Sequence, residues 1–310
     1  MGTRPELLVT PKDLDAVQRL ISAGADAILI GEERYGLRLA GEFSRSDITE
    51  AVDVAHAKGK NVYVAMTALF HNEKVDELAD YIAFLNRTNV DGIVFGDPAV
   101  LMTVREVAPA MKLHWNTETT VTNWFTANYW GRKGASRAVL SREINMEAIL
   151  EIKDNAEVAV EVQVHGMTCM FQSKRTLIGH YMQFQGKNLE VERRDKDRNL
   201  LLFDPERDAR YPIYEDENGT HIMSPNDICI IDELEEMIDA GIDCFKIEGL
   251  LKSTDYMEQV TSIYREAIDL CLDQRGEYED RKEQYLDVLN SLQPQYRKLD
   301  TGFFFKETVY

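Results

Sequence analysis

Eight short apolar segments recur along the 310-residue chain, and most are separated by a longer segment with helical periodicity. The expected strands are Glu6–Val9, Ala27–Ile30, Asn61–Met66, Gly92–Phe95, Lys112–Trp115, Arg137–Leu140, Val158–Val164 and Cys244–Ile247. Between them, as at Val75, Leu78, Ile82 and Leu85, apolar residues recur every three or four positions, which places one apolar stripe on a helix. Parallel strands need such crossover helices. The pattern predicts an α/β protein with a (β/α)8 TIM-like barrel, and a doubly wound open sheet is the alternative.

This rhythm breaks between the seventh and eighth strands. Residues 166–225 contain an apolar run, Leu200–Phe203, and a turn-forming pair, Asn218-Gly219. We expect an inserted β-hairpin region here, on the C-terminal face of the barrel. The domain organisation that follows is a barrel over residues 1–275, which includes the insertion, and a C-terminal helix and tail over residues 276–310.

The charge balance restricts the function. The chain carries 35 Lys and Arg against 54 Asp and Glu, a formal net charge of −19. Because phosphate contacts need clustered basic side chains, this balance argues against nucleic-acid binding by the chain alone. The sequence has no apolar stretch of about eighteen residues and no leader pattern at its start, so we expect no membrane contact and a cytoplasmic protein.

Strand alternation assigns side chains to the barrel interior. Val160 and Val162 are expected to face the outer helices, as is Phe245, because successive side chains of a strand point to opposite faces. The polar residues assigned to the inside are His114, Asn116, Glu161, Gln163, His165, Lys246 and Glu248. Barrel interiors are mostly aliphatic, and barrel active sites lie at the C-terminal ends of the strands. This set therefore predicts a site at the barrel mouth, and a polar network that only fills the barrel is the alternative.

Other chemistries have weaker support. His114, Glu161, His165 and Glu248 are metal-ligand types, but their spacing matches no HExxH or similar motif. The sequence contains no GxSxG nucleophile elbow and no GxGxxG loop. The four cysteines lie far apart without a CxxC pair, which is typical of reduced thiols.

Several segments, taken together and in this order, resemble the peptidase U32 family. They include AGADAILIGEERYGLR (Ala23–Arg38), LSRE (Leu140–Glu143), EVQVHGMTC (Glu161–Cys169), SPNDIC (Ser224–Cys229), FKIEG (Phe245–Gly249) and TGFFF (Thr301–Phe305). Members of this family are named as peptidases, including collagenase-like ones, and others resemble [4Fe–4S] proteins that serve hydroxylation of tRNA, ribosomal RNA or ubiquinone precursors.

The resemblance also implies what this chain lacks. Cys169 and Cys229 match two of the family's four cluster positions, whereas Thr176 stands where the family has a cysteine. A cubane cluster needs about four thiolates. We therefore expect no cofactor and no metal in this chain, and a [4Fe–4S] cluster in a longer U32 paralogue that forms a heterodimer with it.

Such a pair resembles a tRNA 5-hydroxyuridine system that uses prephenate, an anionic metabolite, and it would contact tRNA only through the partner. In this interpretation His114, His165 and Lys246 bind or polarise the anion, and Glu161 and Glu248 orient them. Substrate-binding residues would be Arg34, Asn116, Arg142 and Gln163. The alternatives are a peptidase or collagenase-like hydrolase, and a non-catalytic partner of the longer paralogue.

Overall fold

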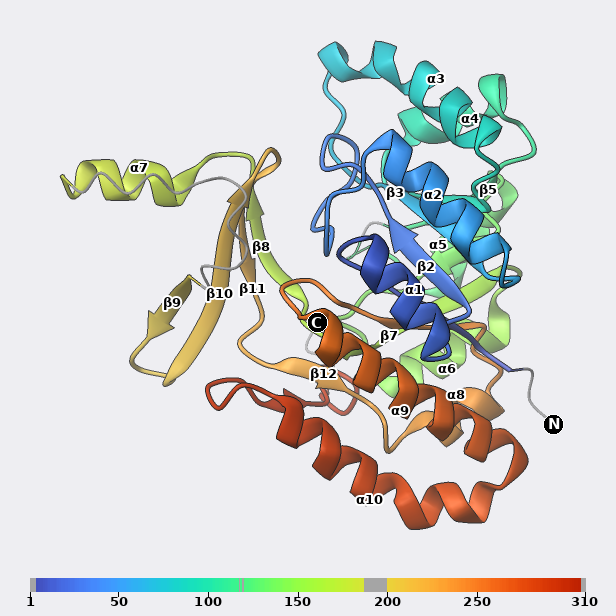
Figure 1. Cartoon of the computed structure of the whole chain (residues 1–310), viewed down its shortest axis with the longest axis vertical. Coiled ribbons are helices and arrows are strands. Elements are labelled where there is room, and N and C mark those ends of the chain that lie inside the picture. Colours follow the sequence, from blue (N-terminus) through green and yellow to red (C-terminus); the bar gives the residue numbers. More distant parts are fainter. Residues whose placement is uncertain (1–3, 117, 119, 187–199, 308–310) are drawn as a thin grey trace.

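The computed structural model, which describes residues 4–116, 118, 120–186 and 200–307, contains a closed parallel barrel (Figure 1). The barrel strands are β1 (Glu6–Val9), β2 (Ala27–Ile30), β3 (Asn61–Met66), β4 (Gly92–Phe95), β5 (Lys112–Trp115), β6 (Arg137–Val139), β7 (Ala159–Gly166) and β13 (Cys244–Ile247). Strand β13 closes the barrel because it pairs in parallel with β1 on one side and with β7 on the other. The predicted TIM-like barrel is confirmed, and the open-sheet alternative is excluded.

Helices cover the outside of the barrel. They are α1 (Leu14–Ser22), α2 (Arg45–His56), α3 (Asn72–Arg87), α4 (Pro98–Val107), α5 (Trp124–Arg132), α6 (Met146–Asn155), α8 (Leu234–Asp239) and α9 (Thr254–Asp273). Several begin at a short polar side chain that accepts a backbone hydrogen bond. Ser44 and Asp47 form a reciprocal capping box at the start of α2, which satisfies backbone donors that the first helical turn leaves unpaired.

The barrel has two distinct apolar regions. Outward-facing strand residues, among them Val160, Val162 and Phe245, pack with the helices in the main core. A smaller cluster fills part of the barrel interior and includes Leu8, Ala65, Val94 and Cys244. Phe245 therefore faces the helices while its neighbour Lys246 faces inward, as strand alternation predicts.

The insertion forms an arm that projects from the barrel (Figure 1). Its sheet is antiparallel in the order β8 (Cys169–Ser173), β11 (Gly219–Met223), β10 (Ala209–Asp216) and β9 (Leu201–Asp204), and α7 (Leu177–Phe184) accompanies it. The predicted hairpin is the β10–β11 pair, but it belongs to a larger, four-stranded sheet. Gly219 makes the tight turn possible, because it has a φ of +109° and a Cβ there would lie 2.0 Å from the carbonyl oxygen of Ser173. The insertion also contains a basic run in its sequence, Arg193–Arg198, which lies outside the described residues.

The C-terminal segment packs onto the barrel. Helix α10 (Arg275–Leu292) follows α9 and buries Tyr278, Tyr285 and Leu289 in the main core. Beyond it, β14 (Leu299–Asp300) pairs in parallel with β12 (Asp227–Cys229), which itself pairs in antiparallel fashion with the end of β7. These contacts place the C-terminal segment beside the base of the arm.

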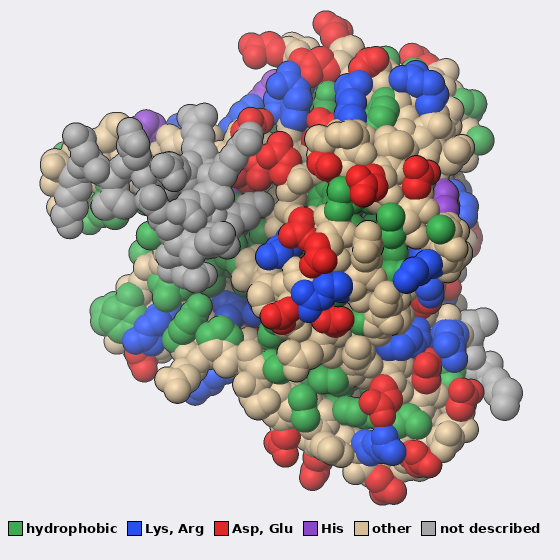
Figure 2. All heavy atoms as spheres, viewed as in Figure 1, with side chains coloured by type: hydrophobic (Ala, Val, Ile, Leu, Met, Phe, Trp, Pro, Cys, Tyr) green, Lys and Arg blue, Asp and Glu red, His purple; other side chains and the backbone are tan. Residues whose placement is uncertain are grey.

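Acidic and basic side chains are interspersed over the barrel surface shown in Figure 2. Among the described residues, the structure has no helix that is both long and apolar enough to cross a membrane.

Candidate functional site

Polar side chains line a narrow cavity at the mouth of the barrel. Thr10 follows β1 and Asn116 follows β5, while Lys246 and Glu248 lie at the end of β13. Loops add three charged residues, Arg38, Glu118 and Arg142. The carboxyl ends of the strands converge here, which is where TIM-barrel proteins build their active sites.

Lys246 and Glu248 form the centre of one half of this site. The ammonium of Lys246 lies 2.9 Å from Oε2 of Glu248, and the Thr10 hydroxyl donates a 2.9 Å hydrogen bond to Oε1. The backbone N–H of Leu250 donates to the same oxygen at 3.1 Å. Burial raises the pKa of Glu248, but the Lys246 ammonium and these hydrogen bonds hold it below its usual value. Glu248 is therefore a carboxylate fixed in one orientation.

Arg38, Glu118 and Arg142 form the other half. The Glu118 carboxylate pairs with the Arg38 guanidinium, and Nη2 of Arg142 lies 3.5 Å from the same carboxylate oxygen. Burial raises the pKa of Glu118, but the opposing effect of Arg142 and Arg38 is larger and brings it to about 2. Arg38 also donates a 2.9 Å hydrogen bond to Gln172 of β8, which links this half to the arm.

The mouth therefore has an excess of positive charge in a small space. Three cations, Arg38, Arg142 and Lys246, face two carboxylates, Glu118 and Glu248. Such a balance favours an anion over a cation. The cavity leaves only about 30 Å³, because apolar side chains from the arm and nearby loops, including Met167, Met223 and Leu250, close over it.

A second polar layer lies deeper, toward the N-terminal ends of the strands. Arg137 is the first residue of β6, and its guanidinium donates to Glu6 at 2.6 Å and to Glu161 at 3.2 Å. The Tyr63 hydroxyl also donates to Glu6, at 2.8 Å. Glu161 pairs across the barrel sheet with Cys244, the first residue of β13. Glu161 therefore belongs to a buried ion-pair network below the mouth, in contrast to the expected position at the mouth.

His114 belongs to this deeper layer as well. Its ring packs edge-on against Tyr63, with ring centroids 4.5 Å apart, and it pairs in register with Arg137. Burial and then the nearby Arg137 charge hold the pKa of His114 well below its ordinary value. This neutral imidazole lies in the layer of Arg137 and does not meet the mouth residues as expected, whereas Asn116, two residues further on, lines the mouth cavity.

His165 differs most from its expected position. Its Nε2 lies 2.7 Å from the Tyr256 hydroxyl and its Nδ1 lies 3.4 Å from the Tyr264 hydroxyl, and both tyrosines belong to α9 outside the barrel. The reason is a register irregularity, since Lys246 pairs with Gln163 whereas Ile247 pairs with His165. The extra residue in β7 reverses the alternation and turns His165 outward. Burial then lowers its pKa to about 3.

The remaining polar candidates have structural partners elsewhere. Arg34 lies on the outer surface, where its guanidinium makes hydrogen bonds of 2.5 and 2.6 Å to Glu77 of α3. This position differs from the expected role of Arg34 in substrate binding, and it lies in a loop that strand alternation cannot orient. Gln163 faces inward and donates to backbone carbonyls at the end of β7 and just beyond it, among them that of Met167 at 3.1 Å.

The cysteines occupy separate environments. Cys169 lies beside the mouth, where burial raises the pKa of its thiol and the Arg38 charge partly offsets this. Cys229 is buried on the helix side near the Tyr264 hydroxyl, and burial raises its pKa to about 11. Thr176, which stands at the second of the family's cluster positions, precedes α7. These residues do not fit a four-thiolate cluster, and the described residues contain no group of three or more His, Cys, Asp or Glu that could hold a metal ion.

Arg38, Glu118, Thr10 and Arg137 are absent from the residues expected at the site, although Thr10 and Arg137 lie at the ends of expected strands where alternation points them inward. Arg38 and Glu118 lie in loops, and both have a positive φ, 52° and 64° respectively. Residues other than glycine rarely adopt a positive φ, and they keep it only where the surrounding structure holds the backbone in place. For Arg38, the matched segment Ala23–Arg38 was the available indication.

The fold defines a TIM-barrel protein whose mouth carries a cluster of charged side chains. More specifically, the chain belongs to peptidase family U32, whose family model matches residues 12–309. The resemblance seen in the sequence is thereby confirmed.

Three relatives illustrate the similarity. The chain is 64% identical over 307 residues to tRNA hydroxylation protein P2 of Bacillus subtilis (strain 168), a match that covers 99% of both chains. It is 35% identical over 276 residues to tRNA hydroxylation protein P1 of the same organism, which covers 87% of this chain but 64% of that one. The structure of the U32 peptidase Mk0906 superposes with a TM-score of 0.52 at 16% identity, over 80% of this chain and 94% of that one, which shows the shared fold.

Proposed function

We propose that this chain is a subunit of a tRNA hydroxylation system that forms 5-hydroxyuridine. The observation that carries this proposal is the 64% identity to tRNA hydroxylation protein P2 over 99% of both chains. A protein with that degree of identity over its full matched length keeps the same barrel, arm and loops, so a shared role is the simplest inference.

We further propose that the mouth binds a small anionic metabolite such as prephenate. The excess positive charge from Arg38, Arg142 and Lys246 supports an anionic ligand. The present volume of about 30 Å³ holds roughly one water molecule. Binding therefore requires Met167, Met223 and Leu250 to move away from the mouth, and the arm is the element that carries Met223.

The proposed partner is a longer U32 protein that supplies tRNA contacts and the [4Fe–4S] cluster. Two differently sized tRNA hydroxylation proteins, P1 and P2, occur in Bacillus subtilis, and this chain is similar to both. Figure 2 shows hydrophobic side chains on the projecting arm. The large apolar residues exposed there are Met170, Phe171, Leu177, Tyr181, Phe184, Leu202 and Phe203. Exposed apolar surface of this kind supports contact with another protein.

A peptidase function, which the family name suggests, has no support from the site geometry. In the described part of the chain no cysteine or serine side chain makes a hydrogen bond to a histidine that could act as its base. Burial raises the pKa of all four thiols, which opposes thiolate formation at neutral pH.

Two experiments test the proposal. Deletion of the gene should remove 5-hydroxyuridine and its derivatives from digested total tRNA, measured by liquid chromatography and mass spectrometry. An affinity-tagged chain should co-purify with the longer U32 protein of the same genome, and Phe184→Ser and Phe203→Ser on the arm should weaken that recovery. Unchanged nucleosides in the deletion strain would refute the assignment, and recovery without the partner would refute the heterodimer.

A further inference from the structure

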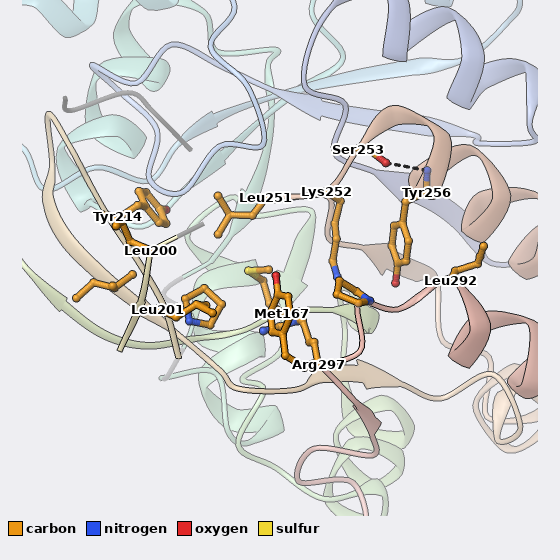
Figure 3. Close-up of a pocket in the computed structure, with 14 residues that line it drawn as sticks. Met167, Leu200, Leu201, Tyr214, Leu251, Lys252, Ser253, Tyr256, Leu292 and Arg297 are labelled. Atoms are coloured by element: carbon orange, nitrogen blue, oxygen red, sulfur yellow. Dashed lines mark hydrogen bonds between the residues drawn. The ribbon is translucent and has the colours of Figure 1, made fainter. Parts of the chain in front are cut away.

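A second cavity, of about 170 Å³, lies between the arm and the C-terminal segment. Figure 3 shows its walls, which come from β9 and β10, from the loop before α9 and from the segment after α10. It shares Met167 with the mouth cavity, and its other lining residues are different. This cavity is therefore a separate compartment next to the mouth.

Most of the lining is apolar or aromatic. Leu200, Leu201, Pro212, Ile213, Leu251 and Leu292 form the apolar walls. Tyr214, Tyr256 and Tyr296 add flat ring surfaces. A cavity of about 150 Å³ lined by apolar side chains accommodates benzene. The observed volume therefore has room for one six-membered ring with a small substituent.

One end of the cavity carries a buried charge cluster. Lys252 and Arg297 both pair with Asp227, which is fully buried. Nε and Nη2 of Arg297 lie 2.9 and 2.5 Å from the Asp227 carboxylate, and its remaining donors bond to backbone carbonyls of Ser224, Pro225 and Asn226. Two cations against one carboxylate leave one positive charge in excess.

Lys252 is the group that presents this excess charge to the cavity. Two of its three N–H donors are used, by Asp227 and by the Gln293 side chain at 3.4 Å. The Ser253 hydroxyl points away from this ammonium and caps α9, where it accepts a 3.2 Å hydrogen bond from the backbone N–H of Tyr256, drawn in Figure 3. The ammonium also lies over the ring of Tyr256, 4.6 Å from its centre, so an aromatic wall stands next to the charge.

We propose that this cavity binds a small monocarboxylate that carries a single flat six-membered ring. The carboxylate accepts a hydrogen bond from Lys252, and the ring lies against Leu201 and the tyrosines. This site is distinct from the mouth and does not depend on the proposed role in tRNA hydroxylation.

Calorimetric titration of the full chain with benzoate and with benzamide tests the proposal, because the two probes have nearly the same shape but differ in charge. Benzoate should bind saturably at one site with a Kd in the millimolar range or below, and benzamide should bind at least about tenfold more weakly. Equal binding of the two probes, or no saturable binding of benzoate, would overturn the proposal.

Two neighbouring residues of β9 provide matched variants. Leu201 lines the cavity, whereas Leu202 lies on the opposite face of the strand and is 49% exposed. Leu201→Trp should fill the cavity and weaken benzoate binding at least about tenfold, while Leu202→Trp should change it by less than about twofold. Both variants leave the ion pairs of Asp227 with Lys252 and Arg297 intact. A loss of binding would therefore not be caused by unfolding that follows the removal of a buried charge. Loss of binding in Arg142→Met but not in Leu201→Trp would place the anion at the mouth and contradict this site.

Discussion

Lys246 and Glu248 form an ion pair of 2.9 Å inside the barrel mouth, where both side chains are less than a tenth exposed. Removing one member of a buried pair leaves a charge without its partner. We therefore expect Lys246→Met to lower the free energy of unfolding by about 3–5 kcal/mol, as measured by urea denaturation. The double variant Lys246→Met/Glu248→Gln should recover much of that loss, because no unpaired charge remains. If Lys246→Met were as stable as the wild type, Lys246 and Glu248 would not form a buried ion pair.

The neighbouring residue tests the strand register. Phe245 is fully buried between β13 and the outer helices. Its replacement by alanine should cost about 3–5 kcal/mol of stability, because it removes a ring from the main core and leaves a cavity. Leu69→Ala is the control, since Leu69 is 63% exposed and its loss should change stability by less than about 0.5 kcal/mol. Similar effects of both variants would show that the assigned register is incorrect.

Buried histidines predict an acid-dependent loss of stability. The folded-state pKa is lowered to about 3 for His165 and well below its ordinary value for His114, in each case first by burial. The unfolded chain takes up these protons near pH 6.5, so stability falls as the pH drops from about 6.5 toward 3, by about 1.4 kcal/mol per pH unit for each histidine. Denaturation of His165→Gln between pH 6 and 4.5 should show a slope that is shallower by about that amount. An unchanged slope would mean that His165 is not neutral in the folded protein.

The separate cysteine environments predict a protein without its own cluster. Chain produced alone and purified anaerobically should be colourless, with iron well below the roughly four atoms per chain that a cubane requires. In the native state Cys169 should react first with a thiol reagent, because the other three cysteines are buried. A brown chromophore with about four irons per chain would contradict this prediction.

Much of the barrel could be predicted from the sequence, because the position of each strand and the direction of its side chains follow from a few consecutive residues. Each strand is a short apolar run, and alternation along β13 correctly separates Phe245 from Lys246. The same rule fails at His165, because the register irregularity opposite Lys246 and Ile247 depends on how two distant strands pair. The sequence of β7 contains no pattern that indicates this irregular pairing with β13.

The loop residues of the site were also beyond strand patterns. Arg38 and Glu118 meet at the mouth from two loops that are 80 positions apart in the chain, so their ion pair is a tertiary contact. Arg34, only four positions before Arg38, points to α3 instead. Loop geometry, set by backbone conformations such as the positive φ of Arg38, decides between these two outcomes.

We propose that the charged mouth serves tRNA hydroxylation, and two arginines allow a matched test. Arg142 lines the mouth, whereas Arg34 is paired with Glu77 on the outer surface. The measurement is the 5-hydroxyuridine content of total tRNA in a deletion strain that expresses the wild-type chain, Arg142→Met or Arg34→Met at equal levels. The wild type and Arg34→Met should restore the modified nucleoside, and Arg142→Met should reduce it at least about tenfold, the effect of losing one charge-assisted contact of about 1.4 kcal/mol or more. Full restoration by Arg142→Met would contradict a role of the mouth in tRNA hydroxylation.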